Sequence, residues 1–430
     1  MDFLETAELL TSIDSAAESG DTDRALQLAL ANLSQIERDG ILRERIARTF
    51  AEEGDAESAA TIYRRVGLHY ANAGFPARSL AAAKKAERLG ARADELYGHF
   101  TALYNLRSPN LDQGERHESF GGADGTLDME AEGVQIRGER LRDIALERSL
   151  EEDAFADRPE DLPPLPLASR LPADSLERLA RAVELVEFDE LADVRTDDRG
   201  PGALIWTASP DLTLGDDDPT YYLPMGVLLG LEHYGPASAP PHDDVVARAG
   251  SEILVLSQQT VDQLNDELGN LQERLSTLHR HAFTTSLLDN HPLFDPVPSD
   301  ERRALLDRFA GVHVEKGESV VDTRGESPGL FIVLDGRAEL VRRGDDTEIT
   351  VTSFGPGDVF GELGLVSEEP TGAEIVAVTD GHLLFLPSDQ FDAIVADYPQ
   401  IAKYTVNLAK SRRELIEESA SPEDLEEVSS

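Results

Sequence analysis

The residues with the clearest chemical potential lie in one stretch, VFGELGLVSEEPTGA, which runs from Val359 to Ala373. Gly361 allows close backbone approach, and backbone N–H groups at the start of a short helix can hold a phosphate. Glu362 adds a carboxylate that can accept hydrogen bonds. No arginine or lysine occurs between Arg343 and Lys403. The stretch therefore predicts a phosphate cradle without a nearby cation.

The charge of the whole chain limits its partners. Among 430 residues there are 39 Lys and Arg against 84 Asp and Glu, a net charge of −45. Such a surface repels nucleic acids and anionic membranes, so we expect neither as a partner. Only five of the basic residues are lysines. This composition suits a cytosolic protein in high salt, where screening relieves self-repulsion, or an ordinary acidic protein from a GC-rich genome.

Several functional classes find no support in the sequence. The chain contains no cysteine, which excludes thiol catalysis and disulfides. The N-terminal residues MDFLETAELL do not resemble a signal peptide, and no apolar run is long enough to span a bilayer. His279 and His281 would point to different sides of a helix, so we expect no metal site. Without a recognisable catalytic motif, we predict a cytoplasmic protein that is not an enzyme and has no cofactor or catalytic residue.

Residues 1–105 are rich in alanine and predict helices separated by Gly-Asp turns. Gly20 and Gly54 lie 34 residues apart, as do Ala25 and Ala59. Thirty-four is the period of tetratricopeptide helix pairs. We therefore expect a tetratricopeptide-like array that binds a protein partner, the alternative being a generic Ala-rich helical bundle. Residues 106–162 are acidic, glycine-rich and end in prolines, which predicts a flexible linker with a brief helix around RGERLRDIALERSLEED.

The rest of the chain contains an internal repeat. Three pairs of segments align in the same order at offsets of 126, 131 and 130: PLASRLPADSLERL with PLFDPVPSDERRAL, LPMGVLLGL with FGPGDVFGE, and EILVLSQQTVDQL with HLLFLPSDQFDAI. Each copy carries short strands with glycine-containing turns, which favours a jelly-roll-like barrel, or double-stranded β-helix. We expect a multidomain α and β fold: the helical repeat array, then two such barrels with flanking helices, at 163–264 and 287–412.

The second copy resembles the cyclic-nucleotide-binding domain family along its whole length. The resemblance rests on HPLFDPVPSDERRALLDRF, on the KGESVV and LFIVLDGRAEL strands, and on GPGDVFGELGL with the downstream Pro370 and Ala373. In that family the glutamate at position 362 accepts a hydrogen bond from the ribose 2′-hydroxyl, so cyclic AMP or cyclic GMP is the implied ligand. The implied contact residues are Gly361, Glu362, Leu363, Thr371, Gly372 and Ala373.

The second copy departs from the family pattern at one decisive position. The family arginine that pairs with the cyclic phosphate follows the proline, and here that residue is Thr371, preceded by Glu368 and Glu369. A charge-assisted hydrogen bond contributes roughly 1.5–3 kcal/mol, so its loss weakens binding on the order of 100-fold. Arg337 or Arg342, on a predicted strand, could supply a substitute cation.

The first copy departs further from the family pattern. Leu231 stands where Glu362 stands in the second copy, and no cassette follows it. An apolar residue cannot accept a hydrogen bond from a ribose. We therefore expect a degenerate, structural barrel.

A connecting helix is expected at 265–286, and an acidic tail at 413–430. Apolar residues alternate at spacings of three and four from Val261 to Leu278, namely Val261, Leu264, Leu268, Leu271, Leu275 and Leu278. Such a heptad seam could form a homodimer, or it could pack on its own barrel. No helical domain large enough for helix-turn-helix DNA binding follows the second barrel.

Two functional hypotheses remain open. In the first, the chain is a cytoplasmic regulatory or adaptor protein whose second barrel senses a cyclic nucleotide and relays the signal to a protein partner. In the second, it is a scaffold whose two barrels have lost nucleotide binding. The family resemblance favours the first, and Thr371 and Leu231 favour the second.

Overall fold

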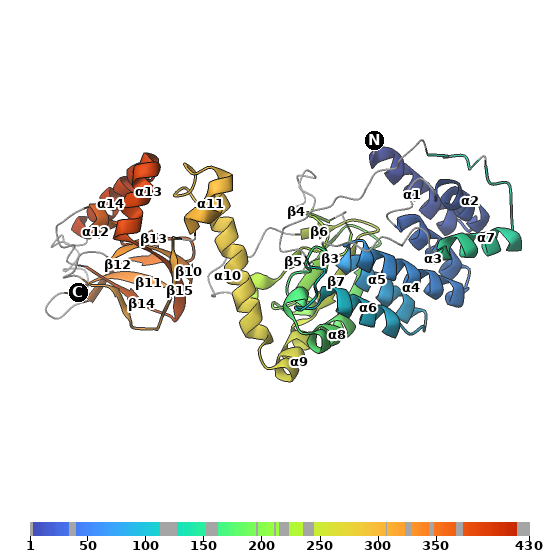
Figure 1. The fold of residues 1–430 in the computed structure, drawn as a ribbon, viewed down its shortest axis with the longest axis horizontal. Coiled ribbons are helices and arrows are strands. Elements are labelled where there is room, and N and C mark those ends of the chain that lie inside the picture. The colour runs from blue at the N-terminus through green and yellow to red at the C-terminus, as the bar shows by residue number, and fades with distance from the viewer. Residues whose placement is uncertain are drawn as a thin grey trace, which may run out of the picture. The chain divides into compact units, whose positions relative to one another are not determined.

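The structure, a computed structural model, describes residues 3–33, 40–111, 127–131, 133–151, 162–194, 197–209, 212–214, 223–234, 245–306, 308–322, 328–343, 348–366 and 373–418. The chain divides into two compact units. Unit 1 comprises Met1–Gly230 and Asp243–Leu271, and unit 2 comprises Leu231–His242 and Gln272–Ser430. The N-terminal part is helical and the C-terminal part is rich in β-sheet (Figure 1).

Unit 1 begins with consecutive helices that pack on one another. They are α1 (Phe3–Glu18), α2 (Thr22–Asn32), α3 (Ile41–Glu52), α4 (Ala56–Asn72), α5 (Pro76–Arg88) and α6 (Asp94–Tyr104). Their apolar faces form a common core that includes Leu26, Ile46, Ile62 and Tyr70. The absence of a side chain at Gly67 makes room for the side chain of Leu96: a Cβ atom at Gly67 would lie 2.4 Å from Leu96 Cδ2.

The two Gly-Asp motifs of the sequence adopt the same local structure. Gly20 and Gly54 have φ of 81° and 88°, the left-handed region that ends a helix. The next residue in each motif, Asp21 or Asp55, caps the following helix by accepting a hydrogen bond from a backbone N–H three residues on, at 3.1 Å. The 34-residue period is therefore a period of helix–turn–helix structure, although assignment to the tetratricopeptide class stays a prediction.

Part of the segment expected to be a flexible linker packs against the helical core instead. Helix α7 (Glu139–Leu150) buries Leu141 and Ala145 among the residues of that core. Arg142 pairs with Asp23 of α2 and with Glu53, the residue that follows α3. Helix α7 is the brief helix expected around RGERLRDIALERSLEED, and it packs on the helical core rather than lying free in a flexible linker. Residues 112–126 and 152–161 of the same segment lie outside the described residues.

The second part of unit 1 contains two small antiparallel sheets, preceded by η3 (Ala168–Arg170) and α8 (Ala173–Ala182). The strand orders are β1-β7-β3-β5 and β2-β6-β4. The strands are β1 (Glu184–Glu187), β2 (Ala192–Asp193), β3 (Leu204–Thr207), β4 (Leu212–Leu214), β5 (Leu228–Leu229), β6 (Val245–Ala247) and β7 (Glu252–Leu256), with η4 (Asp197–Arg199) after β2. Residues of both sheets, among them Ile205, Leu212 and Val255, share one apolar core.

The apolar seam predicted for dimerisation is not one helix. Helix α9 (Gln258–Leu268) ends at Gly269, which has φ of 75°, and α10 (Leu271–Asn290) begins two residues later. A left-handed glycine is a common helix terminator. Except for the half-buried Leu268, the seam residues are already buried within this one chain. Homodimer formation through this seam stays a prediction.

Unit 2 contains two antiparallel four-stranded sheets, with strand orders β13-β10-β15-β8 and β12-β11-β14-β9 (Figure 1). Its strands are β8 (Ala310–Val314), β9 (Ser319–Val321), β10 (Gly329–Asp335), β11 (Ala338–Arg343), β12 (Glu348–Phe354), β13 (Val359–Phe360), β14 (Glu374–Ala377) and β15 (Gly381–Pro387). Its remaining helices are α11 (Ser299–Leu306), α12 (Glu362–Val366), α13 (Ser388–Asp397) and α14 (Pro399–Glu418), with η5 (Leu231–Tyr234).

Strand β10 explains how unit 2 is layered. Leu330 and Ile332 face a core shared with residues of α11, α13 and α14, whereas Phe331 and Val333 face a second core between the two sheets. Successive side chains of a strand point to opposite faces, so a strand buried on both sides must be apolar throughout. Helix α14 continues to Glu418, six residues into the segment expected to be an acidic tail, and 419–430 lie outside the described residues.

Candidate functional site

The candidate site is the stretch 359–373, here called the cassette. Strand β13 ends at Phe360, Gly361 follows with φ of 89°, and Glu362 begins the five-residue helix α12. A left-handed conformation at this point favours glycine and turns the chain sharply from strand into helix. The turn directs the side chain of Glu362 inward, and Glu362 is only 1% exposed.

The carboxylate of Glu362 is paired with a cation from a distant helix. Arg412 of α14 lies 50 residues further along the chain, and its Nη1 donates to Glu362 Oε2 at 2.6 Å. The guanidinium of Arg412 also lies over the ring of Phe354, 4.6 Å from its centroid. The second carboxylate oxygen, Oε1, is buried without a hydrogen-bond partner among the described residues. The site thus contains an ion pair and one unused acceptor.

Burial dominates the protonation of Glu362. Removing the carboxylate from water raises its pKa above the usual range, and the charge of Arg412 offsets this only in part. A hydrogen-bond donor that reached Oε1 would stabilise the charged form of Glu362.

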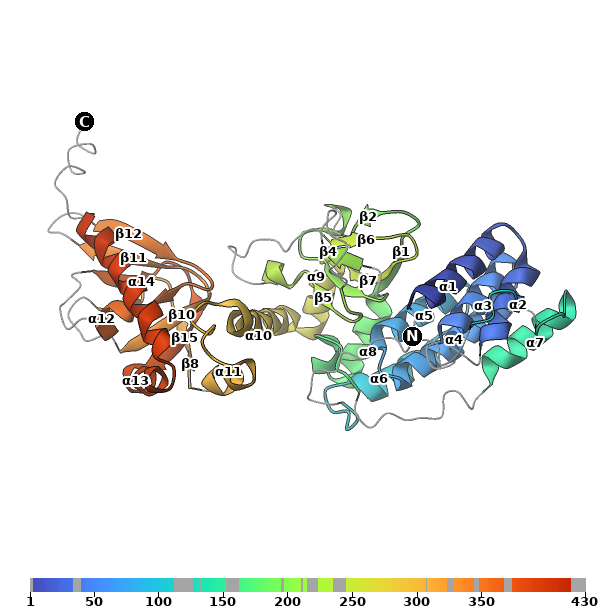
Figure 2. The same cartoon turned by 90° about the horizontal axis from the view of Figure 1, so that it is seen from above.

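Helix α14 brings Arg412 to the cassette because of its apolar pattern. Ile401, Thr405, Ala409 and Ile416 are buried on this helix, at spacings of four, four and seven. Arg412 occupies the position between Ala409 and Ile416 on the same face. Figure 2 shows α14 lying alongside α12 and the strands of unit 2. Ala409 and Ile416 belong to the core between the sheets, together with Leu363 and Ala373.

The structure describes only part of the predicted ligand-binding set. Gly361, Glu362, Leu363 and Ala373 come together, with Leu363 and Ala373 buried in the inter-sheet core. Thr371 and Gly372, like Glu368 and Glu369, lie outside the described residues. Arg337 is exposed and directly precedes strand β11, and Arg342 lies on β11 opposite Ile349.

The sequence prediction missed Arg412. The available signal was an arginine on the helix face that otherwise carries Ile401, Thr405, Ala409 and Ile416, which predicts a buried cation paired with an acid.

The corresponding place in the first repeat has glycines of similar conformation but no carboxylate. Gly226 and Gly230 have φ of 79° and 91°, close to the values of 89° at Gly357 and Gly361, with which they align. Strand β5 is followed by η5 as β13 is followed by α12. Leu231 is the first residue of η5, where it cannot accept a hydrogen bond. The interpretation of the first repeat as a degenerate barrel therefore remains a proposal, supported by the position of Leu231.

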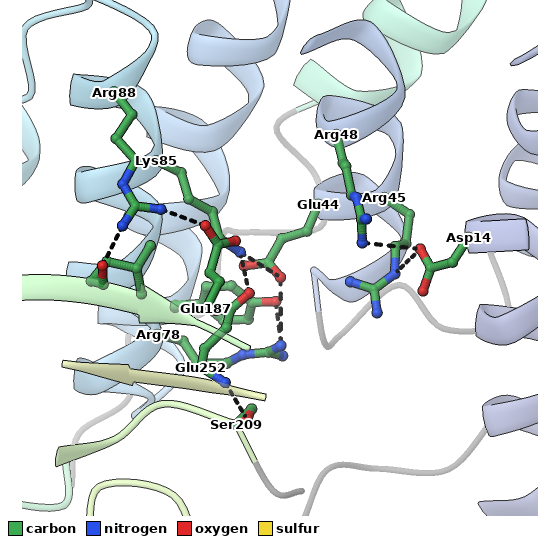
Figure 3. Close-up of polar contacts among 12 residues, drawn as sticks. Asp14, Glu44, Arg45, Arg48, Arg78, Lys85, Arg88, Glu187, Ser209 and Glu252 are labelled. Carbon is green, nitrogen blue, oxygen red and sulfur yellow. Dashed lines mark hydrogen bonds and ion pairs between the residues drawn. The ribbon is translucent and has the colours of Figure 1, made fainter. Parts of the chain in front are cut away.

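Unit 1 contains a cluster of buried charged residues, shown in Figure 3. Lys85 Nζ lies 2.6 Å from Glu252 Oε1 and 3.8 Å from Glu44 Oε2. Arg78 Nη2 lies 3.4 Å from the same Glu44 oxygen. The exposed fraction of these four side chains is at most 10%. The two acidic and two basic side chains neutralise one another. The cluster of Glu44, Arg78, Lys85 and Glu252 is here called the ionic joint.

The ionic joint connects helices α3 and α5 to strand β7. Arg88 of α5 reinforces it by pairing with Glu187 of β1 and donating to the carbonyl of Leu185 (Figure 3). One face of α5 is therefore covered by the sheet of the same unit. In the part of the chain that the structure describes, no group of three or more potential ligands could hold a metal ion, and no helix could cross a membrane.

Comparison with known proteins assigns the family of the second repeat. Residues 311–398, which include Gly361 and Glu362, match the family model for the cyclic nucleotide-binding domain. The chain contains a cyclic nucleotide-binding domain. This domain is shared with protein kinase regulatory subunits: the type II regulatory subunit of cAMP-dependent protein kinase from Drosophila melanogaster is 25% identical over 134 residues, or 31% of this chain and 35% of that protein.

Two further proteins are similar to parts of this chain. A lysophospholipase from Aspergillus oryzae is 32% identical over 108 residues, which is 25% of this chain but 7% of the enzyme. The regulatory subunit of a cAMP-independent protein kinase A from Trypanosoma brucei is 21% identical and covers 54% of this chain and 84% of that one, with a TM-score of 0.26. The chain spans about a third of the length of the Drosophila relative.

Proposed function

We propose that this chain is a cytoplasmic, non-catalytic regulatory protein in which the cyclic nucleotide-binding domain senses a cyclic nucleotide and the N-terminal helices bind a protein partner. The observation that carries the proposal is the buried carboxylate of Glu362, with Oε1 unpartnered among the described residues, inside the matched domain. A ribose hydroxyl is a neutral donor of the right kind for this oxygen. Cyclic AMP and cyclic GMP both offer one.

The sequence at the phosphate side limits the affinity. Thr371 can donate one neutral hydrogen bond where the family resemblance calls for an arginine. The expected affinity is therefore on the order of 100-fold weaker than with the charged pair. The net charge of −45 opposes an anionic ligand further at low ionic strength.

The partner surface belongs to the part of the helical array that the sheet containing β1 and β7 leaves uncovered. Helix α5 contributes Lys85 and Arg88 to contacts with β7 and β1, so that face is occupied within unit 1. A partner would therefore use the other helices of the array. Repeat arrays of this size commonly present such surfaces to proteins.

Calorimetry on the full chain tests the nucleotide proposal. Cyclic AMP and cyclic GMP are titrated in low and in multimolar salt, into the native protein and into Glu362→Gln, with the exposed Glu414→Gln on α14 as the matched control. Binding at about millimolar or tighter that is lost in Glu362→Gln and kept in the control supports the proposal. Absence of binding at about 10 mM ligand would reject it.

The second candidate is a scaffold in which neither repeat binds a nucleotide. It is favoured by Leu231 at the site of the first repeat and by the ion pair that already occupies Glu362 in the second. The two candidates differ in the calorimetric outcome above, because a scaffold gives no heat with either nucleotide.

A further inference from the structure

We propose that the face of the helical array formed by α2, α3 and α4 is the docking surface for the protein partner, and that this chain covers it with a segment of its own. That segment, here called the strap, comprises residues 127–131 and 133–150 and includes α7, which packs on these three helices (Figure 2). A partner segment of the same chemistry competes with the strap. The inference rests on the partner-binding part of the proposed function and does not depend on nucleotide sensing.

The segment that carries the strap leaves the rest of unit 1 and returns to it at one place. Leu111 and Leu162 form an isolated parallel β-bridge, and the backbone N–H of Leu162 donates to the carbonyl of Asn110 at 2.6 Å. Leu162 is 0% exposed there. The strap therefore belongs to an insertion whose two ends are held together without its help. Such an insertion can leave the array while the remainder of unit 1 keeps its path.

Polar side chains of α2 contact the main chain of the strap. Asn32, which is 0% exposed, donates to the carbonyl of Asp128 at 3.0 Å and accepts from the N–H of the same residue at 2.7 Å. Gln27 donates to the carbonyl of Ile136 at 2.8 Å. The other main-chain contacts are those of Arg24 with the carbonyls of Met129 and Glu130, and of Asp23 with the N–H of Gly138. Main-chain contacts give affinity for an extended segment with little dependence on its sequence.

Side chains of α7 make the docking selective. Leu141 and Ala145 are 0% exposed and belong to the core of the array. Arg142 donates from Nη1 to Asp23 Oδ1 at 3.2 Å and from Nε to Glu53 Oε2 at 2.7 Å. An uncharged residue in place of Arg142 leaves two acids without their cation, which disfavours such a segment. A competing partner segment therefore needs an extended stretch, an apolar helical face and an arginine on the helix.

Covalent attachment makes the strap a strong competitor. A segment on a short tether acts at an effective concentration on the order of millimolar. A free segment of equal intrinsic affinity at about micromolar concentration therefore faces a roughly thousandfold excess. The apparent affinity for the partner is reduced by the fraction of molecules in which the strap is released, so whatever weakens the strap strengthens partner binding. The strap thus sets the threshold at which the array accepts a partner.

The experiment uses the full chain and, as the probe, a fluorescently labelled peptide with the sequence of residues 127–150. Fluorescence anisotropy measures binding of the peptide to the native chain, to Arg142→Gln and to Leu141→Asp. The matched control is Arg140→Gln, because Arg140 is exposed on the same helix and its variant removes the same charge. A second peptide carries the Arg142→Gln substitution.

Two further measurements separate release of the strap from unfolding. Amide hydrogen exchange compares α7 with α4 in each variant, and urea unfolding followed by the fluorescence of Trp206 reports on unit 1. In Arg142→Gln the amides of α7 should exchange about tenfold faster than in the native chain, while those of α4 stay unchanged. The unfolding transition seen by Trp206 should remain cooperative in every variant.

Peptide binding should appear when the strap is weakened. Arg142→Gln and Leu141→Asp should bind the labelled peptide about tenfold or more tighter than the native chain, and Arg140→Gln should match the native chain. The Arg142→Gln peptide should bind the same variants about tenfold more weakly than the native peptide.

The array side of the contact is tested in the weakened background. Adding Glu53→Gln to Leu141→Asp should weaken binding of the native peptide about tenfold, because Glu53 accepts from Arg142. Glu57→Gln is the control, since Glu57 is exposed on α4, and it should leave peptide binding unchanged. Equal effects of the two substitutions would place the peptide elsewhere and overturn the inference.

Three other results would also overturn it. They are no gain of peptide binding in either weakened variant, equal rises of exchange in α7 and α4, and loss of the Trp206 transition in both variants; each would make the strap a fixed part of the fold. Failure of nucleotide sensing is distinguishable. A chain that gains the peptide but binds no cyclic nucleotide keeps the docking surface and loses the sensing function, and the converse result keeps sensing and rejects the docking surface.

Discussion

Lys85 Nζ lies 2.6 Å from Glu252 Oε1, and this contact joins helix α5 to strand β7 across 167 residues of sequence. Both side chains are at most 10% exposed, and Glu44 and Arg78 complete the ionic joint around them. A helical array and a β-sheet that are distant in the chain are therefore held in one unit by buried charges. Removing one member of such a pair leaves the other as an unpaired charge that is buried away from water.

Glu252→Gln should destabilise unit 1 by about 3 kcal/mol, because it leaves Lys85 with Glu44 alone. Glu187→Gln is the control: it also removes an acid paired to α5, but the Glu187 side chain is 45% exposed, so the expected loss is below about 1 kcal/mol. Urea unfolding followed by the fluorescence of Trp206, the single tryptophan and buried in β3, reports on unit 1. Equal losses in the two variants would contradict the role of the ionic joint.

The ionic joint should also make unit 1 sensitive to acid. Burial alone would raise the pKa of Glu252, but the charges of Lys85 and Arg78 outweigh it and hold the pKa below the usual range. A depressed pKa contributes stability that is fully present above the unfolded value of about 4.3 and is lost as pH falls through the folded value. In Glu252→Gln, the free energy of unfolding monitored by Trp206 fluorescence should therefore fall less steeply with decreasing pH below about pH 4.5. An identical acid profile in the variant would show that Glu252 does not titrate as inferred.

Gly67→Ala and Gly98→Ala should have opposite effects on the helical array. A Cβ at Gly67 in α4 would lie 2.4 Å from Leu96 Cδ2 and 3.3 Å from Ala82 Cβ, so overpacking should cost about 1–3 kcal/mol. A Cβ at Gly98 in α6 meets nothing within 4 Å among the described residues, so alanine should stabilise by about 0.5–1 kcal/mol through helix propensity. Thermal unfolding of the two variants measures both signs. A stabilising Gly67→Ala would mean that α4 and α6 do not approach so closely.

Thr371→Arg should create or strengthen cyclic nucleotide binding. It restores the cation that the family resemblance places after Pro370, and one charge-assisted pair to a phosphate should improve affinity about 10- to 100-fold. Thr371→Gln, which is polar without charge, should leave the affinity close to native. Calorimetry with cyclic AMP distinguishes them. An inert Thr371→Arg would indicate that the cassette cannot present a phosphate to this position at all.

The sequence by itself determined the features that depend on near neighbours. Gly54 and Asp55 end one helix and cap the next because the atoms involved are within a few residues of each other. The aligned glycines Gly230 and Gly361 adopt the same left-handed conformation because a strand-to-short-helix turn requires it locally. The match of residues 311–398 to the cyclic nucleotide-binding domain follows from such local patterns.

Only the tertiary structure decided which distant groups meet. No spacing rule assigns Arg412 to Glu362 or Lys85 to Glu252, since each pairing depends on how whole elements pack. The same holds for the apolar seam of α9 and α10: its period is real, but Gly269 divides it between two helices. Local conformational preference is set by the backbone and its nearest side chains. The pairing of buried charges is set by long-range packing instead, because a charge that is removed from water must be neutralised by a partner.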